Sequence, residues 1–315
     1  MLLPLPRSSV ILQQILSGVD VEQPRSSCIS ELHEFDDCRY KVERLKEAPD
    51  VLTASFGHTN PLPAAAEAAL RRQYEGISSL AFEAETNYQL TLHVSAQTLR
   101  GLPDARRAAV LDKLAAVRLY AVGAQLRQLL QALAAGELTS APPQAVLARP
   151  GAPFFVRAEG EALTALFPIR QSEGREGALA AAFVQEFAGA NRAASCGDAP
   201  RCIFTLPGQA PPFLLEDADL KACDCGGGFL AFVIEARHVA APERVDAVAW
   251  SLLTFYAHID VHVKRFKGLV HNQLRQRADA MLAVLERASF AAREQKTRKT
   301  SSGRIFIEQA AARTA

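Results

Sequence analysis

Residues 38 to 95 contain short stretches in which apolar and polar positions alternate or β-branched residues cluster. The stretches 38–45 and 50–57 have this pattern, and 78–84 and 88–95 show it again on either side of the three residues "ETN". Alternation places one face of a strand on a core, and a connection this short suits a hairpin. The pattern therefore predicts an antiparallel sheet.

The pattern then changes to a helical one over residues 104–137. This stretch is rich in Ala, Leu, Arg and Gln, which favour helix. Its apolar residues recur close to every 3.6 positions: Val110, Leu114, Val117, Val122, Leu126, Leu129 and Leu133. We predict one helix that ends at Gly136, followed by a proline-containing linker over 137–144.

The second half of the chain repeats this order. Short strands are predicted within 144–169 and at 201–206 and 227–238, whereas 177–193 fits either a helix or a strand. The fold class is therefore α+β, with two similar α/β sandwich domains, each an antiparallel sheet plus helix, and a long C-terminal helix. The predicted boundaries are 1–139, 140–241, 242–293 for the helix and 294–315 for a basic tail.

The last helix is predicted to begin at Pro242, since proline suits a first helical turn. Over 243–292 it would be about 75 Å long, whereas a compact domain of this size is ~30–40 Å across. Its apolar seam alternates three- and four-residue spacings and then drifts: Val245, Val248, Leu252, Phe255, Ile259, His262, Phe266, Val270 and Leu274. We expect one side of this helix to pack on its own sheet and the seam to face a partner chain.

Positive charge is concentrated in the second half of this helix and in the tail. The segment 264–299 contains ten basic and three acidic residues, although the whole chain has a net charge of only +1. The basic residues are Lys264, Arg265, Lys267, Arg275, Arg277, Arg287, Arg293, Lys296, Arg298 and Lys299. The segment is either a solvated face or a docking surface for an acidic partner such as actin or anionic lipid. No nucleic-acid partner is expected, since no RNA- or DNA-binding motif is present.

His258 and His262 stand four residues apart, a spacing that suits a helical metal site. A zinc protease, however, needs glutamate immediately after the first histidine, and Ile259 holds that position. A zinc site built on these two histidines also needs a third ligand, and the candidates are the thiolates of Cys223 and Cys225. We expect no metal, no cofactor and no catalytic residue, and keep a cryptic zinc hydrolase as the alternative.

Composition agrees with a soluble intracellular protein. No secretory segment is recognised, and no apolar run reaches the ~18–20 residues of a membrane span. Six cysteines in 315 residues are too few for a disulfide scaffold, so we expect reduced thiols.

Several stretches resemble a known family. They are "FVQEF" (183–187), "PPFLLED" (211–217), "GFLAFVIEARH" (228–238), "HVKRFKGLVHNQLRQR" (262–277) and "RKTSSGRIF" (298–306). The most specific is 262–277, in which His262, Lys264, Lys267, His271, Arg275 and Arg277 fit the family pattern. The chain resembles the family of the scaffold subunit, subunit 2, of the actin-related protein 2/3 complex, which nucleates branched actin filaments.

The resemblance implies a non-enzymatic, cytoplasmic protein of the actin cytoskeleton. Its long helix would pair with that of the twenty-kilodalton subunit through the seam, and the dimer would hold actin-related proteins 2 and 3. The expected contacts with filamentous actin are Lys264, Lys267, Arg275, Arg277, Lys296, Arg298 and Lys299. The family has an aromatic residue at His258, so it implies no metal site. A stand-alone actin- or lipid-binding module is the remaining alternative.

Overall fold

The computed structural model describes residues 6–21, 27–170, 175–190, 198–211, 213, 215–223, 225–293, 297–299, 301–303 and 305–307. The chain forms two compact units, residues 1–263 and residues 264–315. No metal-binding group of three or more His, Cys, Asp or Glu residues occurs among these described residues.

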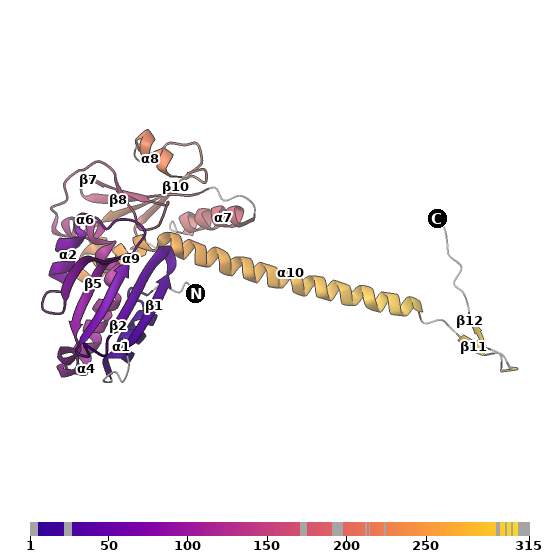
Figure 1. Cartoon of the computed structure of the whole chain (residues 1–315). Coiled ribbons are helices and arrows are strands. Elements are labelled where there is room, and N and C mark those ends of the chain that lie inside the picture. Colours follow the sequence, from indigo (N-terminus) through magenta and orange to yellow (C-terminus); the bar gives the residue numbers. More distant parts are fainter. Residues whose placement is uncertain are drawn as a thin grey trace. The chain divides into compact units, whose positions relative to one another are not determined.

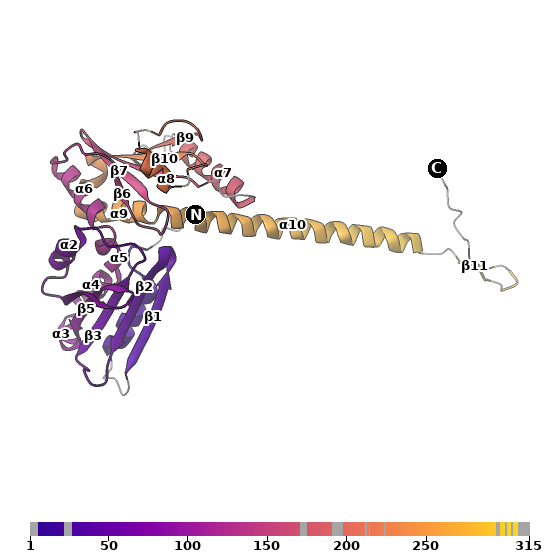
Figure 2. The ribbon, with the colours of Figure 1, turned by 45° about the horizontal axis from the view of Figure 1, so that its top comes forward.

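The first sheet contains β1 (Cys28–Glu34), β2 (Cys38–Arg44), β3 (Val51–Gly57), β4 (Ser79–Glu85) and β5 (Tyr88–Ser95). The strands are antiparallel in the order β1-β2-β3-β5-β4, as Figure 2 shows for four of them. The four predicted strands are confirmed. The edge strand β1 was not predicted, because all seven of its side chains are exposed or only half-buried and its sequence shows no apolar alternation.

The second sheet repeats the topology of the first. It contains β6 (Gln144–Val146), β7 (Phe154–Glu159), β8 (Ala162–Pro168), β9 (Arg201–Thr205) and β10 (Phe229–Glu235). The order β6-β7-β8-β10-β9 places each strand as its counterpart lies in the first sheet, again with antiparallel pairing. The predicted α+β fold with two similar sheets is confirmed (Figure 1). The domain boundaries stay a prediction.

The helices of the first half are α1 (Val10–Val21), α2 (Ala66–Gln73), α3 (Ala96–Gly101), α4 (Asp104–Ala115), α5 (Val117–Ala121) and α6 (Ala124–Ala135). The prediction of one helix over 104–137 is therefore wrong. The chain turns at Ala116 and again at Gly123, where an added Cβ would lie 2.4 Å from the Leu119 carbonyl oxygen and 2.7 Å from Leu253. Gly136 ends α6 in the left-handed conformation, as predicted.

The later helices are α7 (Arg175–Ala190), α8 (Asp217–Ala222), α9 (Pro242–Leu253) and α10 (Phe255–Arg293). Two short 3-10 turns, η1 (Phe35–Asp37) and η3 (Ala236–Val239), and the hairpin strands β11 (Thr297–Lys299) and β12 (Ile305–Ile307) complete the described elements. The ambiguous stretch 177–193 is thus mainly helical. Pro242 occupies the first turn of α9, as predicted.

The predicted long helix is broken once, at Thr254. This buried residue has φ −101° and ψ 7°, and its hydroxyl donates a hydrogen bond to the Trp250 carbonyl at 2.8 Å. The break leaves α10 with 39 residues. At 1.5 Å per residue this is a helix of about 58 Å, still longer than a compact domain of this size.

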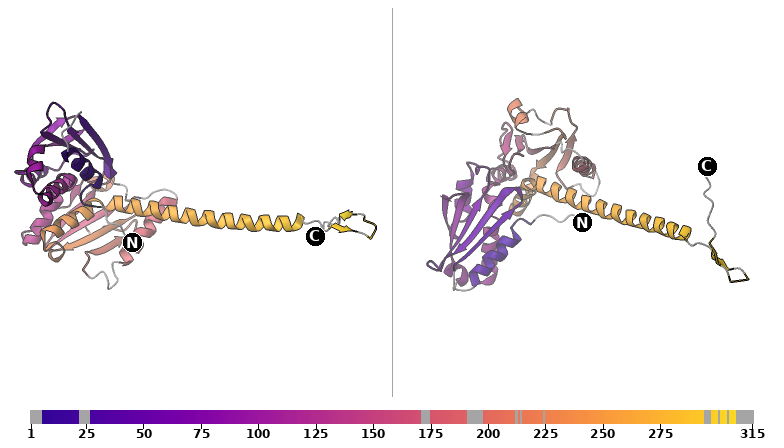
Figure 3. Two further views of the ribbon diagram at one scale, coloured as in Figure 1. Left: turned by 90° about the horizontal axis from the view of Figure 1, so that it is seen from below. Right: turned by 45° about the vertical axis from the view of Figure 1, so that its right-hand side comes forward.

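One core joins the two sheets. Leu92 of the first sheet, Phe167 of the second, Leu253 of α9 and Ile259 of α10 belong to the same cluster of buried side chains, and α9 lies between the sheets (Figures 1 and 3). A smaller core, which includes Cys223, covers the other face of the second sheet near α8. The Cys-x-Cys stretch therefore supplies a buried thiol to packing.

Candidate functional site

The first part of the predicted partner-facing seam lies in the chain's own core. The exposed fractions are 4% for Val245, 7% for Leu252, 8% for Phe255 and 7% for Ile259, and Val248 packs against the same core. Little of these side chains is left for a partner to cover, and their assignment to the partner interface stays a prediction. A helix buried between two sheets of its own chain needs the same apolar circumference as one shared with a partner.

Aromatic side chains hold the beginning of α10 against the second sheet. The ring of Phe255 lies 4.7 Å from that of Phe167 and 5.1 Å from that of Phe232, measured between centroids. The Tyr256 hydroxyl donates a 2.8 Å hydrogen bond to the Pro168 carbonyl, and burial raises the pKa of this phenol. Such ring pairs add stabilisation beyond their buried area.

A chain of ion pairs connects both halves to the start of α10. Asp36, in η1, accepts a 2.6 Å contact from Arg118 of α5 and a 3.4 Å contact from Arg149, which precedes β7. Arg149 also contacts Asp260 of α10 at 2.7 Å. Arg118 is 1% exposed, and its guanidinium lies 4.4 Å from the centre of the Phe35 ring. Asp260 is therefore engaged in an ion pair that fixes α10.

His258 and His262 contact one another. Their Nε2 atoms are 3.0 Å apart, so one neutral ring donates a hydrogen bond to the other. His262 also stacks on Phe183 of α7, with centroids 5.6 Å apart and an interplanar angle of 10°. Burial, followed by the nearby His262, lowers the pKa of His258. A metal ion would have to replace this hydrogen bond, so the pair supports a packing role.

Replacing His258 by phenylalanine is expected to make stability less sensitive to acid. Because the pKa of His258 is lowered in the folded state, the unfolded chain binds the proton more readily as pH falls through ~6.5. The melting temperature of the wild-type chain should therefore fall more between pH 7.5 and 5 than that of His258→Phe. The exposed His271→Phe is the control, and equal pH dependence of all three proteins would contradict this account.

The second part of α10 exposes large apolar side chains. The exposed fractions are 53% for Phe266, 58% for Leu274, 69% for Met281, 62% for Val284 and 60% for Leu285, and Val270 is half-buried. At 100° per residue these six positions fall within a sector of about 100°, and the exposed Leu269 and Leu282 lie about 60° beyond it on either side. We call this set the apolar stripe: Phe266, Val270, Leu274, Met281, Val284 and Leu285. Contiguous exposed apolar surface on a folded protein marks an interaction site.

The predicted filament contacts do not share one face. Lys264 and Arg275 lie about 160–180° around the helix from Phe266, Lys267 lies at the border of the stripe, and Arg277 lies inside it. Of the tail residues, Arg298 and Lys299 belong to β11, and Lys296 lies outside the described residues. The basic set therefore divides into at least two surfaces.

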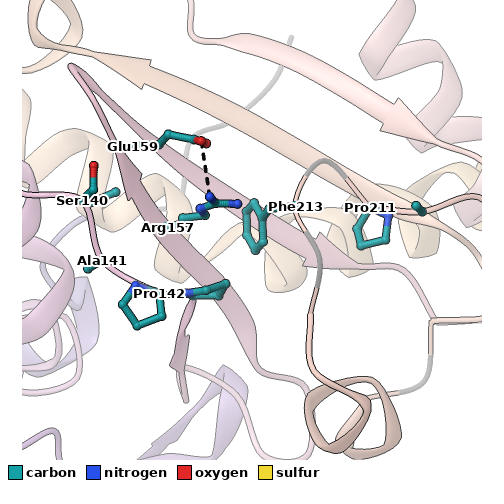
Figure 4. Close-up of a pocket in the computed structure, with 10 residues that line it drawn as sticks. Ser140, Ala141, Pro142, Arg157, Glu159, Pro211 and Phe213 are labelled. Carbon is teal, nitrogen blue, oxygen red and sulfur yellow. Dashed lines mark hydrogen bonds and ion pairs between the residues drawn. The ribbon is translucent and has the colours of Figure 1, made fainter.

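A separate hollow of about 810 Å³ opens beside β7 (Figure 4). Pro142 and Pro211 line it, and the Arg157 guanidinium lies 3.3 Å from Glu159 and 5.7 Å from the centre of the Phe213 ring. The described residues of its lining include no histidine or cysteine. This lining offers neither a histidine base nor a thiol nucleophile.

In its described part the chain has two similar sheets and a helix, α10, whose second part exposes an apolar stripe. This places it among proteins that carry an exposed apolar interaction surface. No described helix is long and apolar enough to cross a membrane. Residues 58–292 match the family "Arp2/3 complex, 34 kD subunit p34-Arc". The chain therefore belongs to this family of structural subunits of the Arp2/3 complex.

Curated relatives support the same family. "Actin-related protein 2/3 complex subunit 2A" of Arabidopsis thaliana is 32% identical over 268 residues, which cover 81% of each chain. Subunit 2B of the same plant is 24% identical over 319 residues, 95% of this chain and 81% of the relative. The subunit 2 of Schizosaccharomyces pombe is 29% identical over 151 residues, 47% of this chain and 45% of the relative.

Proposed function

We propose that this chain is the non-catalytic scaffold of an Arp2/3 complex in the cytoplasmic actin cytoskeleton. It would form the core dimer with the twenty-kilodalton subunit, hold actin-related proteins 2 and 3, and contact the mother filament from which a branch grows. Membership in the p34-Arc family supports the complex. The apolar stripe on α10 is the observation that carries the proposed dimer contact.

The strength of this contact can be bounded. Full burial of a large apolar side chain stabilises by ~1.5–3 kcal/mol, and the stripe residues are already partly covered, so each adds about 1 kcal/mol. Six such residues give roughly 6 kcal/mol, which is close to the lower cost of associating two proteins. The stripe therefore needs additional contacts from the partner to form a stable dimer.

Co-purification tests the proposal most broadly. A tagged copy of the full chain, isolated from cells of its own organism, is expected to bring down both actin-related subunits and the twenty-kilodalton subunit in equal amounts. Recovery of the chain alone, or bound to lipid or actin without those subunits, would contradict the scaffold proposal and favour the stand-alone module.

We also propose that the tail takes part in filament contact. Reversing Lys296, Arg298 and Lys299 to glutamate should weaken co-sedimentation of the assembled complex with filamentous actin, because charge complementarity guides capture by an acidic surface. The loss should be greater at low salt, where exposed charges are less screened. Complex assembly serves as the control and should stay intact. Co-sedimentation that the reversal leaves unchanged across a salt series would mean that the tail is only solvated.

A further inference from the structure

Arg277 is a charged residue in the middle of an apolar surface. It lies about 20° around α10 from Phe266, and its neighbours one turn away on either side are Leu274 and Met281. These two side chains are 58% and 69% exposed. A partner that covers the apolar stripe must therefore cover Arg277 as well.

The helix itself places no carboxylate where it could neutralise Arg277. The positions three and four residues away are Gln273, Leu274, Ala280 and Met281, none of which is acidic. The charge would therefore have to be satisfied from outside the helix.

Arg275 has a different environment, although it stands only two residues away. Asp279 follows it by four residues on the same face, and Glu286 lies on that face too, about 160–180° from Arg277. Arg275 therefore has acidic neighbours on its own helix, although the exposed Leu282 lies about 20° from it on the same face.

Burying an unpaired charge costs more free energy than the apolar contacts on either side of it contribute to binding. We therefore propose that Arg277 sets the register of the α10 interface, and that the partner helix carries an aspartate or glutamate opposite it. Guanidinium and carboxylate groups pair through two parallel hydrogen bonds, which fixes position along the helix as well as sign of charge. A polar residue within an apolar helical seam is known to select register and partner in this way.

This inference rests on the proposed dimer and moves Arg277 from the filament-facing set to the partner-facing set. It also explains how a stripe of modest apolar area can choose one partner. Many helices could cover the six apolar positions, but only one with a correctly placed carboxylate would leave no unpaired charge.

The test compares Arg277→Glu with the matched variant Arg275→Glu, using the full chain and the twenty-kilodalton subunit. We expect Arg277→Glu to weaken the heterodimer at least about thirtyfold, which corresponds to about 2 kcal/mol, and Arg275→Glu to change affinity less than about threefold. Each acidic residue of the partner's long helix is then changed to lysine in turn. One such change should restore binding to Arg277→Glu and weaken binding to the wild-type chain.

Equal effects of the two variants, or rescue by no acidic position of the partner helix, would overturn the inference while leaving the dimer itself established. Absence of binding by the wild-type chain would instead refute the proposed function, and the role of Arg277 with it. Circular dichroism and melting temperature of both variants serve as folding controls, since both residues are exposed in the isolated chain.

Discussion

Replacing Asp36 by alanine is expected to destabilise the chain by about 3–5 kcal/mol, because it leaves a buried arginine without its counter-charge. Arg118 is 1% exposed and contacts the Asp36 carboxylate at 2.6 Å. The same change removes a 3.4 Å contact with Arg149, which itself pairs with Asp260 on α10. The loss should appear as a lower free energy of unfolding in urea.

Asp37→Ala is a closely matched control. Asp36 and Asp37 have left-handed backbones with φ 60° and 58°, so alanine causes similar backbone strain at each. The Asp37 side chain, however, is 39% exposed, pairs with the partly exposed Arg39 and accepts a hydrogen bond from the exposed Thr59 hydroxyl. An exposed pair of this kind contributes ~0–1 kcal/mol. If the two alanine variants unfold at the same urea concentration, the buried Asp36–Arg118 ion pair does not make the expected contribution to stability.

Placing two carboxylates in the apolar stripe is expected to abolish capture of the partner subunit. Phe266→Asp with Leu274→Asp removes two large apolar contacts and places two carboxylates in the interface. The one at position 266 has no lysine or arginine three or four residues away, so its burial as an unpaired charge costs several kcal/mol. Affinity should fall by more than about a thousandfold, the factor for ~4 kcal/mol. Both positions are more than half exposed, so the isolated chain should fold normally, whereas aspartate at the buried Ile259 would unfold it.

The control for this double variant is Asn272→Asp with Gln276→Asp. These exposed positions lie on the side of α10 opposite the stripe, and each likewise exchanges a neutral residue for aspartate. Capture of the twenty-kilodalton subunit by the control should match the wild type. Capture that survives in the stripe variant, measured by pull-down with both proteins at matched concentrations, would show that the partner binds elsewhere.

Periodicity predicted the regular elements because their burial is one-sided. The strand β2 alternates buried and half-buried residues along its length, and the sequence shows the same alternation. The edge strand β1 has no buried side chain, and its sequence does not alternate apolar and polar residues. The helix breaks at Ala116 and Thr254 were also missed, because neither residue differs from its helical neighbours in a way that predicts a break.

The sequence revealed the apolar spacing of the last helix, but it did not reveal which surface covers each part of that helix. The same three- and four-residue spacing continues from Val245, which is buried in the chain's own core, to Phe266, which is exposed. Apolar spacing indicates which face of a helix is apolar, but it does not predict whether the same chain or another chain covers that face. No local sequence pattern could have predicted the ion pairs of Asp36, because Arg118 and Arg149 are far from it in the sequence.

Hydrogen exchange of the full chain, alone and with the twenty-kilodalton subunit, tests the central claim most directly. In the isolated chain the backbone amides of residues 264–287 should exchange faster than those of the buried strands β3 and β10, since the side chains along this stretch are largely exposed. Binding of the subunit should slow exchange along 264–287 and leave β3 and β10 unchanged. Protection elsewhere with no change in 264–287 would contradict the account.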